Sequence, residues 1–179
     1  MNHPPVFLLA CGWLPPPFPR VDLLCAQWGS TYIDEQFRLF LDKVFGQNFS
    51  ATLEHKEPQL FTQLMDSFEG AKHKFETAGP AFRNVKLPNG FADFVKSFCK
   101  QPIVKVVKAY PGGPTAVTFG RAAGLKIGRE VMMEFFNAVV DPMIFEVQRL
   151  VRRFPVDFIF LVGGLGSSPV VKDRVNAAF

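Results

Sequence analysis

The sequence predicts an α/β domain in which helices pack on a small mixed sheet. Three observations support this prediction. Long segments repeat apolar residues every three or four positions, which is typical of helices, and the short β-branched runs between them are typical of strands. Of the 179 residues, 48% are hydrophobic and 20% are charged, so the chain has enough apolar side chains for a core.

The first predicted helix begins near Tyr32 and ends before Gly46. Five apolar residues follow the helical spacing i, i+3, i+4, i+7 and i+8: Phe37, Phe40, Leu41, Val44 and Phe45. Thr31 and Asp34 have the three-residue spacing of a capping box, which sets the expected start of the helix. We therefore expect Asp34 to cap the helix rather than to act as a catalyst.

Two further helices and a strand are predicted next. One helix covers residues 58–76 and is stopped by Gly79 and Pro80. The other covers residues 89–100, where phenylalanines recur on one face. Residues 103–110 are β-branched and apolar with interspersed lysines, and this pattern predicts a strand.

A turn, two short strands and a long helix follow. The Pro-Gly-Gly-Pro segment at residues 111–114 predicts the turn, and residues 116–119 and 124–127 predict the strands. The helix is predicted over residues 129–153. We expect a kink or a brief break at Pro142, because proline lacks the N–H of a helical hydrogen bond.

A glycine-rich turn connects the last predicted strand, residues 156–162, to a C-terminal helix with Ser168 near its N-cap and Pro169 at its first position. Glycines let a ligand approach the backbone, and the free N–H groups of a helix N-terminus favour anionic or electron-rich groups. The turn lacks the lysine of a Walker A loop, the complete dinucleotide-binding pattern and the G-x-S-x-G pattern of a nucleophile elbow. By itself it leaves open both a ligand site and a ligand-free connection.

The turn also carries a family resemblance. Residues 160–169, FLVGGLGSSP, resemble the adenosine motif of the actin-like ATPase superfamily, and in particular divergent Hsp70-like proteins of the heat shock 70 kDa protein 12 group, of fungal type. Residues 29–37 resemble the start of the first helix of lobe II in the nucleotide-binding domain, and residues 127–142 resemble the long helix before the adenosine strand. The resemblance implies a partial actin-like ATPase (ribonuclease H-like) lobe over residues 24–179. The Pro-rich residues 1–23 are expected to be an irregular leader outside it.

The resemblance implies an adenine-nucleotide site made by two groups of residues. One group is the glycine turn, and the other is a helix similar to the family's E-x-x-K-R signature: Gly163, Gly164, Gly166 and Ser167 in the turn, and Glu69, Lys72 and His73 in the helix. Glu69 and Lys72 would contact the ribose hydroxyls and the adenine. His73 stands where the family has arginine, which stacks better on a ring. Without the glycine turn, the helix pattern favours an ordinary solvated face.

The resemblance implies a chaperone-type ATPase fragment that binds ATP or ADP but does not hydrolyse it alone. The family's phosphate-binding D-x-G-T and D-x-G-G-G-T segments are absent from the sequence, as are the catalytic lysine and carboxylates of the first lobe. No catalytic residue is therefore assigned. Mg²⁺ would accompany the nucleotide through ligands that are not in this chain.

Composition argues against several other functions. The net charge is +4 and the basic residues are scattered, so no nucleic-acid partner is expected. No apolar run approaches the roughly 18–20 residues of a membrane span, so no membrane partner is expected either. The three cysteines and three histidines lack metal-ligand spacing, so no metal site is expected. Three cysteines cannot all pair in disulfides, which favours a reducing, cytoplasmic location. The alternative function is a non-catalytic interaction module in which exposed faces rich in the 21 phenylalanines bind a partner protein or a second lobe.

Overall fold

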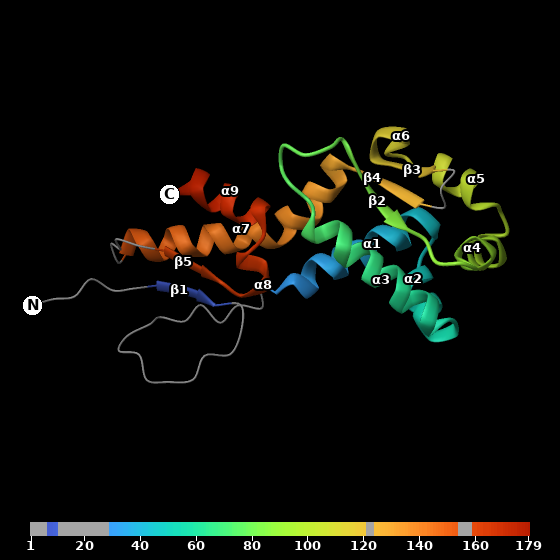
Figure 1. The fold of residues 1–179 in the computed structure, drawn as a ribbon, viewed down its shortest axis with the longest axis horizontal. Coiled ribbons are helices and arrows are strands. Elements are labelled where there is room, and N and C mark those ends of the chain that lie inside the picture. The colour runs from blue at the N-terminus through green and yellow to red at the C-terminus, as the bar shows by residue number, and fades with distance from the viewer. Residues whose placement is uncertain (1–6, 11–28, 121–123, 154–158) are drawn as a thin grey trace, which may run out of the picture. The chain divides into compact units, whose positions relative to one another are not determined.

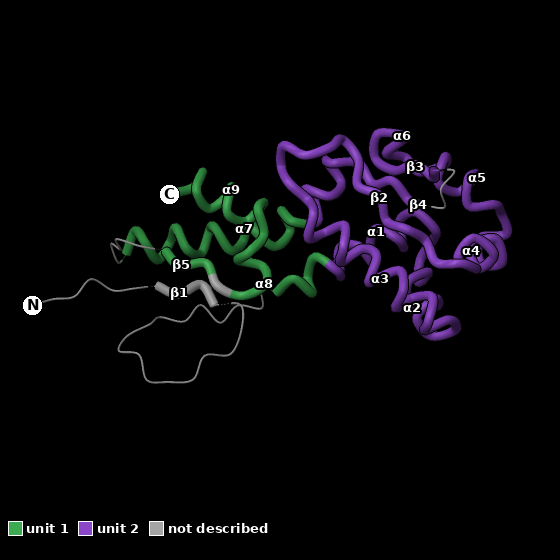
Figure 2. The backbone as a smooth tube through the Cα atoms, in the orientation of Figure 1, with its two compact units in different colours: residues 1–33, 136–179 green, residues 34–135 purple. Residues whose placement is uncertain are grey.

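The computed structural model describes residues 7–10, 29–120, 124–153 and 159–179. The chain divides into two compact units, coloured separately in Figure 2. Unit 1 comprises residues 1–33 and 136–179, and unit 2 comprises residues 34–135.

Unit 2 contains a three-stranded antiparallel sheet with the order β2-β4-β3 (Figure 1). Its strands are β2 (Phe82–Lys86), β3 (Val117–Gly120) and β4 (Gly124–Gly128). Val85 pairs with Leu125 and Val117 pairs with Ile127, and all four side chains are buried. The strands predicted over residues 116–119 and 124–127 are confirmed.

Four helices contribute the larger apolar faces of unit 2: α1 (Ser30–Phe45), α2 (Phe49–Lys56), α3 (Pro58–His73) and α4 (Phe91–Cys99). The five apolar residues predicted to share one face of α1 are all buried. The helix ends at Phe45 because Gly46 has a φ of +113°, a conformation that favours glycine. The capping box is wrong, because α1 already begins at Ser30 and Thr31 lies inside its first turn.

The strand predicted over residues 103–110 is also wrong. These residues form a helix, α5 (Ile103–Lys108), and a single helical turn follows it, α6 (Gly113–Ala116). Ile103 and Val107 are four residues apart and both are buried, whereas Val104 between them is 43% exposed. The side chains are therefore buried with a helical period, and this period overrides the β-branched composition.

The core of unit 2 is built from aromatic rings. The rings of Phe37 and Phe68 stack with centroids 4.0 Å apart and planes 3° apart, and the ring of Phe135 meets both edge-on. A second cluster surrounds Phe49, whose ring contacts those of four others: Phe45, Phe91, Phe94 and Phe98. Many of the phenylalanines thus pack in the interior and do not form an exposed docking face.

Unit 1 contains the C-terminal part of α7 (Arg129–Arg153), the strands β1 (Phe7–Ala10) and β5 (Ile159–Val162), and the helices α8 (Gly163–Gly166) and α9 (Pro169–Ala178). Helix α7 has the predicted bounds and continues through Pro142 without a break. Strand β1 pairs in parallel with β5 (Figure 1). Arg174 of α9 donates hydrogen bonds to Asn137 (2.5 Å) and Asp141 of α7.

The described residues form mostly helices with a few short strands, which is compatible with the predicted partial α/β domain, but the strands do not form one mixed sheet. The described strands form two separate sheets, one antiparallel and one parallel. Most of the leader predicted over residues 1–23 lies outside the described residues, and residues 7–10 within it form β1 rather than an irregular segment. Residues 154–158, which include the start of the last predicted strand, also lie outside them. No helix in the described ranges is long and apolar enough to cross a membrane.

Candidate functional site

The glycine turn of unit 1 has the predicted order of strand, turn and helix. Strand β5 ends at Val162, and Gly163 follows with a φ of +81°, where a side chain would strain the backbone. The helical turn α8 comes next. Ser168 is the N-cap of α9 and Pro169 is its first residue, which confirms both predictions.

The three glycines of the turn have different structural roles. A Cβ atom on Gly166 would lie 3.0 Å from the carbonyl carbon of Leu161, so this glycine allows close packing on β5. Gly164 is exposed, and its φ lies outside the left-handed region. Among the described residues no atom lies within 4 Å of where its Cβ would stand. The backbone conformation favours glycine at 163 and close packing favours it at 166, whereas neither applies at 164, where the backbone is open to another molecule.

Two serines complete the turn. The Ser167 hydroxyl donates a hydrogen bond of 2.7 Å to the Gly164 carbonyl and keeps its lone pairs available as acceptors. The Ser168 Oγ atom is buried and has no hydrogen-bond partner among the described residues, so the N-cap of α9 lacks its usual side-chain bond. The turn thus presents glycine backbone and the Ser167 hydroxyl oxygen rather than charged groups.

The second predicted group, in unit 2, is centred on a buried ion pair. The Lys72 side chain is only 4% exposed, and its Nζ lies 2.5 Å from Asp34 Oδ1. The same ammonium group also pairs with the Glu69 carboxylate, one helical turn earlier on α3. Burial raises the pKa of Asp34 above its usual value, while the hydrogen bond and the charge of Lys72 lower it.

Glu69 is the accessible member of this cluster. Its side chain is 40% exposed, and its second carboxylate oxygen lies 2.9 Å from His73 Nε2. A carboxylate held between Lys72 and His73 can still accept hydrogen bonds from hydroxyl groups. The family resemblance implies that Lys72 contacts the nucleotide directly. In the structure its ammonium group is buried and paired with two carboxylates, so it positions Glu69.

The structure brings together the residues within each predicted group, and the two groups belong to different units. The structure also adds Asp34 to the group around Lys72, whereas the sequence predicted Asp34 only as a capping residue. The acidic side chain of Asp34 near a helix start is visible in the sequence, but its partner Lys72 is 38 residues away. Only the packing of α1 beside α3 pairs them.

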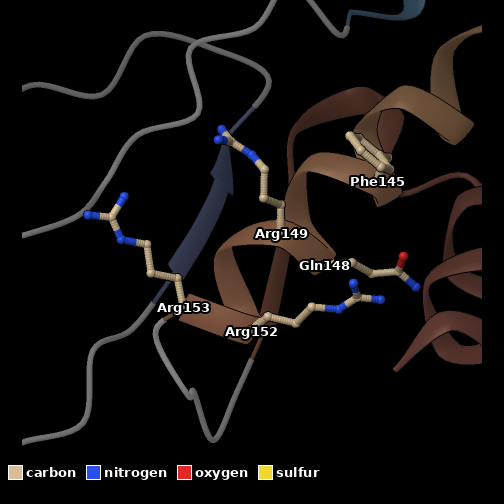
Figure 3. A pocket seen from close by; sticks show the side chains of 5 residues that line it. All are labelled: Phe145, Gln148, Arg149, Arg152 and Arg153. Carbon is tan, nitrogen blue, oxygen red and sulfur yellow. The ribbon is translucent and has the colours of Figure 1, made fainter.

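A separate cavity of about 430 Å³ lies against α7 in unit 1, lined by residues of its C-terminal turns: Phe145, Gln148, Arg149, Arg152 and Arg153 (Figure 3). Phe145 is 64% exposed, and Arg149 forms an ion pair of 2.8 Å with Glu146. The cavity is therefore basic with one aromatic wall. None of its described lining residues was predicted as a site residue.

Comparison with known proteins identifies the relatives of this domain. The chain is 27% identical over 155 residues to Heat shock 70 kDa protein 12A of Homo sapiens, and 26% identical over 155 residues to that of Mus musculus. It is 29% identical over 157 residues to Heat shock 70 kDa protein 12B of Homo sapiens. These matches cover 84–85% of this chain but only 22–23% of the relatives, so the chain spans just under a quarter of their length.

These matches confirm the resemblance to Hsp70-like proteins. The chain is distantly similar to one part of heat shock 70 kDa proteins 12A and 12B. No family model matches the chain. No solved structure matches it either.

Proposed function

We propose that residues 24–179 are part of lobe II of an Hsp70-like nucleotide-binding domain with the actin-like ATPase fold, and that they bind an adenine nucleotide, ATP or ADP. Each of the two groups described above has, within its own unit, the chemistry to contact one part of such a nucleotide. The open backbone at Gly164 is the observation that carries this proposal, because folding alone does not require glycine there.

The glycine turn fits an adenosine group. A flat base or sugar can approach Gly164 closely because no Cβ stands in its way. Gly163 and Gly166 hold the turn in shape, and the Ser167 oxygen can accept a hydrogen bond. The N-terminus of α9 adds the positive end of a helix dipole.

The Glu69 cluster, which consists of Asp34, Glu69, Lys72 and His73, fits a ribose. In the proposed complex, the Glu69 carboxylate accepts hydrogen bonds from ribose hydroxyls, and bonds to a charged acceptor are stronger than neutral ones. Lys72 holds this carboxylate in place. The exposed His73 ring provides a surface beside it.

We expect this chain alone to bind the nucleotide without hydrolysing it. The sequence lacks the phosphate-binding D-x-G-T and D-x-G-G-G-T segments that hydrolysis in the resembled family depends on. We further propose a cytoplasmic location, since Cys99 is a free thiol whose Sγ donates to the Phe45 carbonyl at 3.1 Å.

Protein binding is a second candidate function. The cavity on α7 favours it, because exposed aromatic side chains and arginines are enriched at the energetic centres of protein interfaces. Its basic lining would suit an acidic partner. This candidate does not require the nucleotide.

The Glu69 contact can be tested with ribose analogues. We expect ATP to bind the wild-type chain more tightly than 2′-deoxy-ATP, as measured by isothermal titration calorimetry. Glu69→Gln should lower the ATP affinity about tenfold, which is typical of losing a hydrogen bond to a charged group, and should reduce the difference between the two nucleotides. Glu130→Gln, which changes an exposed glutamate of α7 outside the cluster, serves as the matched control. Equal affinity of the wild type for both nucleotides would contradict the proposed role of Glu69.

A further inference from the structure

A polar groove crosses the surface of unit 2 between α3 and α4. It consists of two cavities of about 650 Å³ and about 270 Å³ that share Gln63 and Asn89 in their linings. Helix α3 forms one wall. The other wall is the connection from β2 to α4, residues 87–90, together with the first turns of α4.

The wall formed by α3 has a regular spacing. Gln59, Gln63 and Ser67 are four residues apart, so they lie on one face of the helix. From Gln59 to Ser67 the helix rises about 12 Å, at 1.5 Å per residue. That is roughly the length of three to four residues of extended polypeptide.

The groove carries carboxamide groups that are free to bind. The side-chain amides of Gln59, Gln63 and Asn89 form no hydrogen bond with any other described residue. A carboxamide has an NH₂ donor and a carbonyl acceptor, the same complement as a peptide group. Leu60 and the half-buried ring of Phe94 add an apolar surface between these polar groups.

The charges in the groove differ between its two ends. The larger cavity is lined by the carboxylates of Glu57 and Asp93, and its described lining contains no lysine or arginine. The smaller cavity is lined by Lys86 and, within the described residues, by no carboxylate. None of these three charged side chains forms an ion pair within the described part of the chain. A ligand that matches the groove is cationic at one end and anionic at the other.

We propose that this groove binds an extended peptide segment with an arginine or lysine at the end formed by Glu57 and Asp93 and an acidic side chain at the end formed by Lys86. The carboxamides bind the peptide backbone, and the terminal charges select the sequence and its direction. Oppositely charged ends separated by peptide-like groups favour a peptide over an uncharged saccharide.

The groove is separate from the Glu69 cluster. Lys72 follows Gln63 by nine residues, which places the two side chains about 180° apart around α3 at 3.6 residues per turn. Variants in the groove are therefore expected to leave nucleotide binding unchanged.

Fluorescence anisotropy with labelled pentapeptides tests this proposal. The probes are Arg-Ala-Ala-Ala-Glu and Glu-Ala-Ala-Ala-Arg, which cover both backbone directions, and Gln-Ala-Ala-Ala-Gln as the uncharged reference. At low ionic strength we expect one charged peptide to bind saturably and more tightly than the reference. The double variant Glu57→Gln/Asp93→Asn should weaken its binding about five- to tenfold, the usual range for two exposed ion pairs. Gln63→Ala/Asn89→Ala should weaken binding of every peptide.

Two controls separate a loss of peptide binding from a loss of folding. All substituted side chains are at the surface, so circular dichroism should show folded variants, and Glu130→Gln should bind like the wild type. The proposal is overturned if no peptide binds the folded wild type, or if binding is insensitive to both double variants. Displacement of the peptide by maltotetraose would overturn it as well, because it would assign the groove to a saccharide.

Discussion

Replacing Phe68 by alanine is expected to lower the free energy of unfolding by about 3–5 kcal/mol, the usual cost of removing a buried phenylalanine. Phe68 has no exposed surface and stacks directly on Phe37, with ring centroids 4.0 Å apart. It also contacts Phe135 edge-on. The substitution thus leaves a cavity where α1, α3 and the start of α7 meet.

The loss is a large part of the 5–15 kcal/mol that is typical of a folded domain. Urea denaturation followed by circular dichroism measures it. Phe145→Ala is the matched control, since Phe145 is 64% exposed and should change the stability by less than about 0.5 kcal/mol. Similar losses for the two variants would show that the stacked rings are not the centre of the core.

Lys72→Ala is expected to cause the second large loss of stability, roughly 2–3 kcal/mol once the partial exposure of its partners is considered. The substitution leaves the Asp34 carboxylate, 23% exposed, without its cation at 2.5 Å. It also removes the cation that holds Glu69. The double variant Asp34→Asn/Lys72→Met should be more stable than Lys72→Ala, because it removes the uncompensated charge.

The loss of stability in Lys72→Ala should also depend on pH, and the raised pKa of Asp34 determines whether it is larger at low or at neutral pH. Burial raises this pKa and Lys72 lowers it, so removing Lys72 raises it further. A carboxyl group whose pKa is higher in the folded than in the unfolded state stabilises the fold below the unfolded pKa. This stabilisation is lost as the pH rises through the folded pKa. Lys72→Ala should therefore lose less stability at about pH 4 than at about pH 7, and an equal loss at both would contradict the ion pair.

The sequence predicted the helices whose buried faces are long and regular. Helix α7 has the predicted bounds, and the five residues of α1 chosen from their spacing are all buried, together with Ile33. The sequence did not predict β2, because only Val85 of its five residues is buried and a single buried side chain gives no alternating strand pattern. It assigned α5 to a strand because β-branched composition suggested one, whereas the packing of Ile103 and Val107 follows a helical period.

The candidate site was predictable only where its chemistry is local. The positions of Ser168 and Pro169 follow from capping preferences that act within a few residues. The role of Lys72 depends on Asp34, which is distant in sequence and becomes its neighbour only when α1 packs on α3. The distinction between Gly164 and its neighbours also needs the structure, since it rests on which atoms a Cβ would meet.

Gly164 is the best position for testing nucleotide binding, because it is the glycine of the turn at which a side chain would meet no described atom. A valine there meets no described atom within 4 Å of its Cβ and does not require a left-handed φ, so the fold should accept it. A valine at Gly163 or Gly166 would strain the backbone or collide with Leu161. A loss of binding in Gly164→Val therefore reports on the ligand rather than on folding.

The most direct measurement is a titration of the purified chain with ATP that carries a fluorophore on its terminal phosphate. Wild type is compared with Gly164→Val and with Ala177→Val, an exposed control on α9, after circular dichroism has shown all three to be folded. We predict saturable binding by the wild type and by Ala177→Val, and its loss in Gly164→Val. Absence of binding by the folded wild type, or equal binding by all three, would contradict the adenine-nucleotide site.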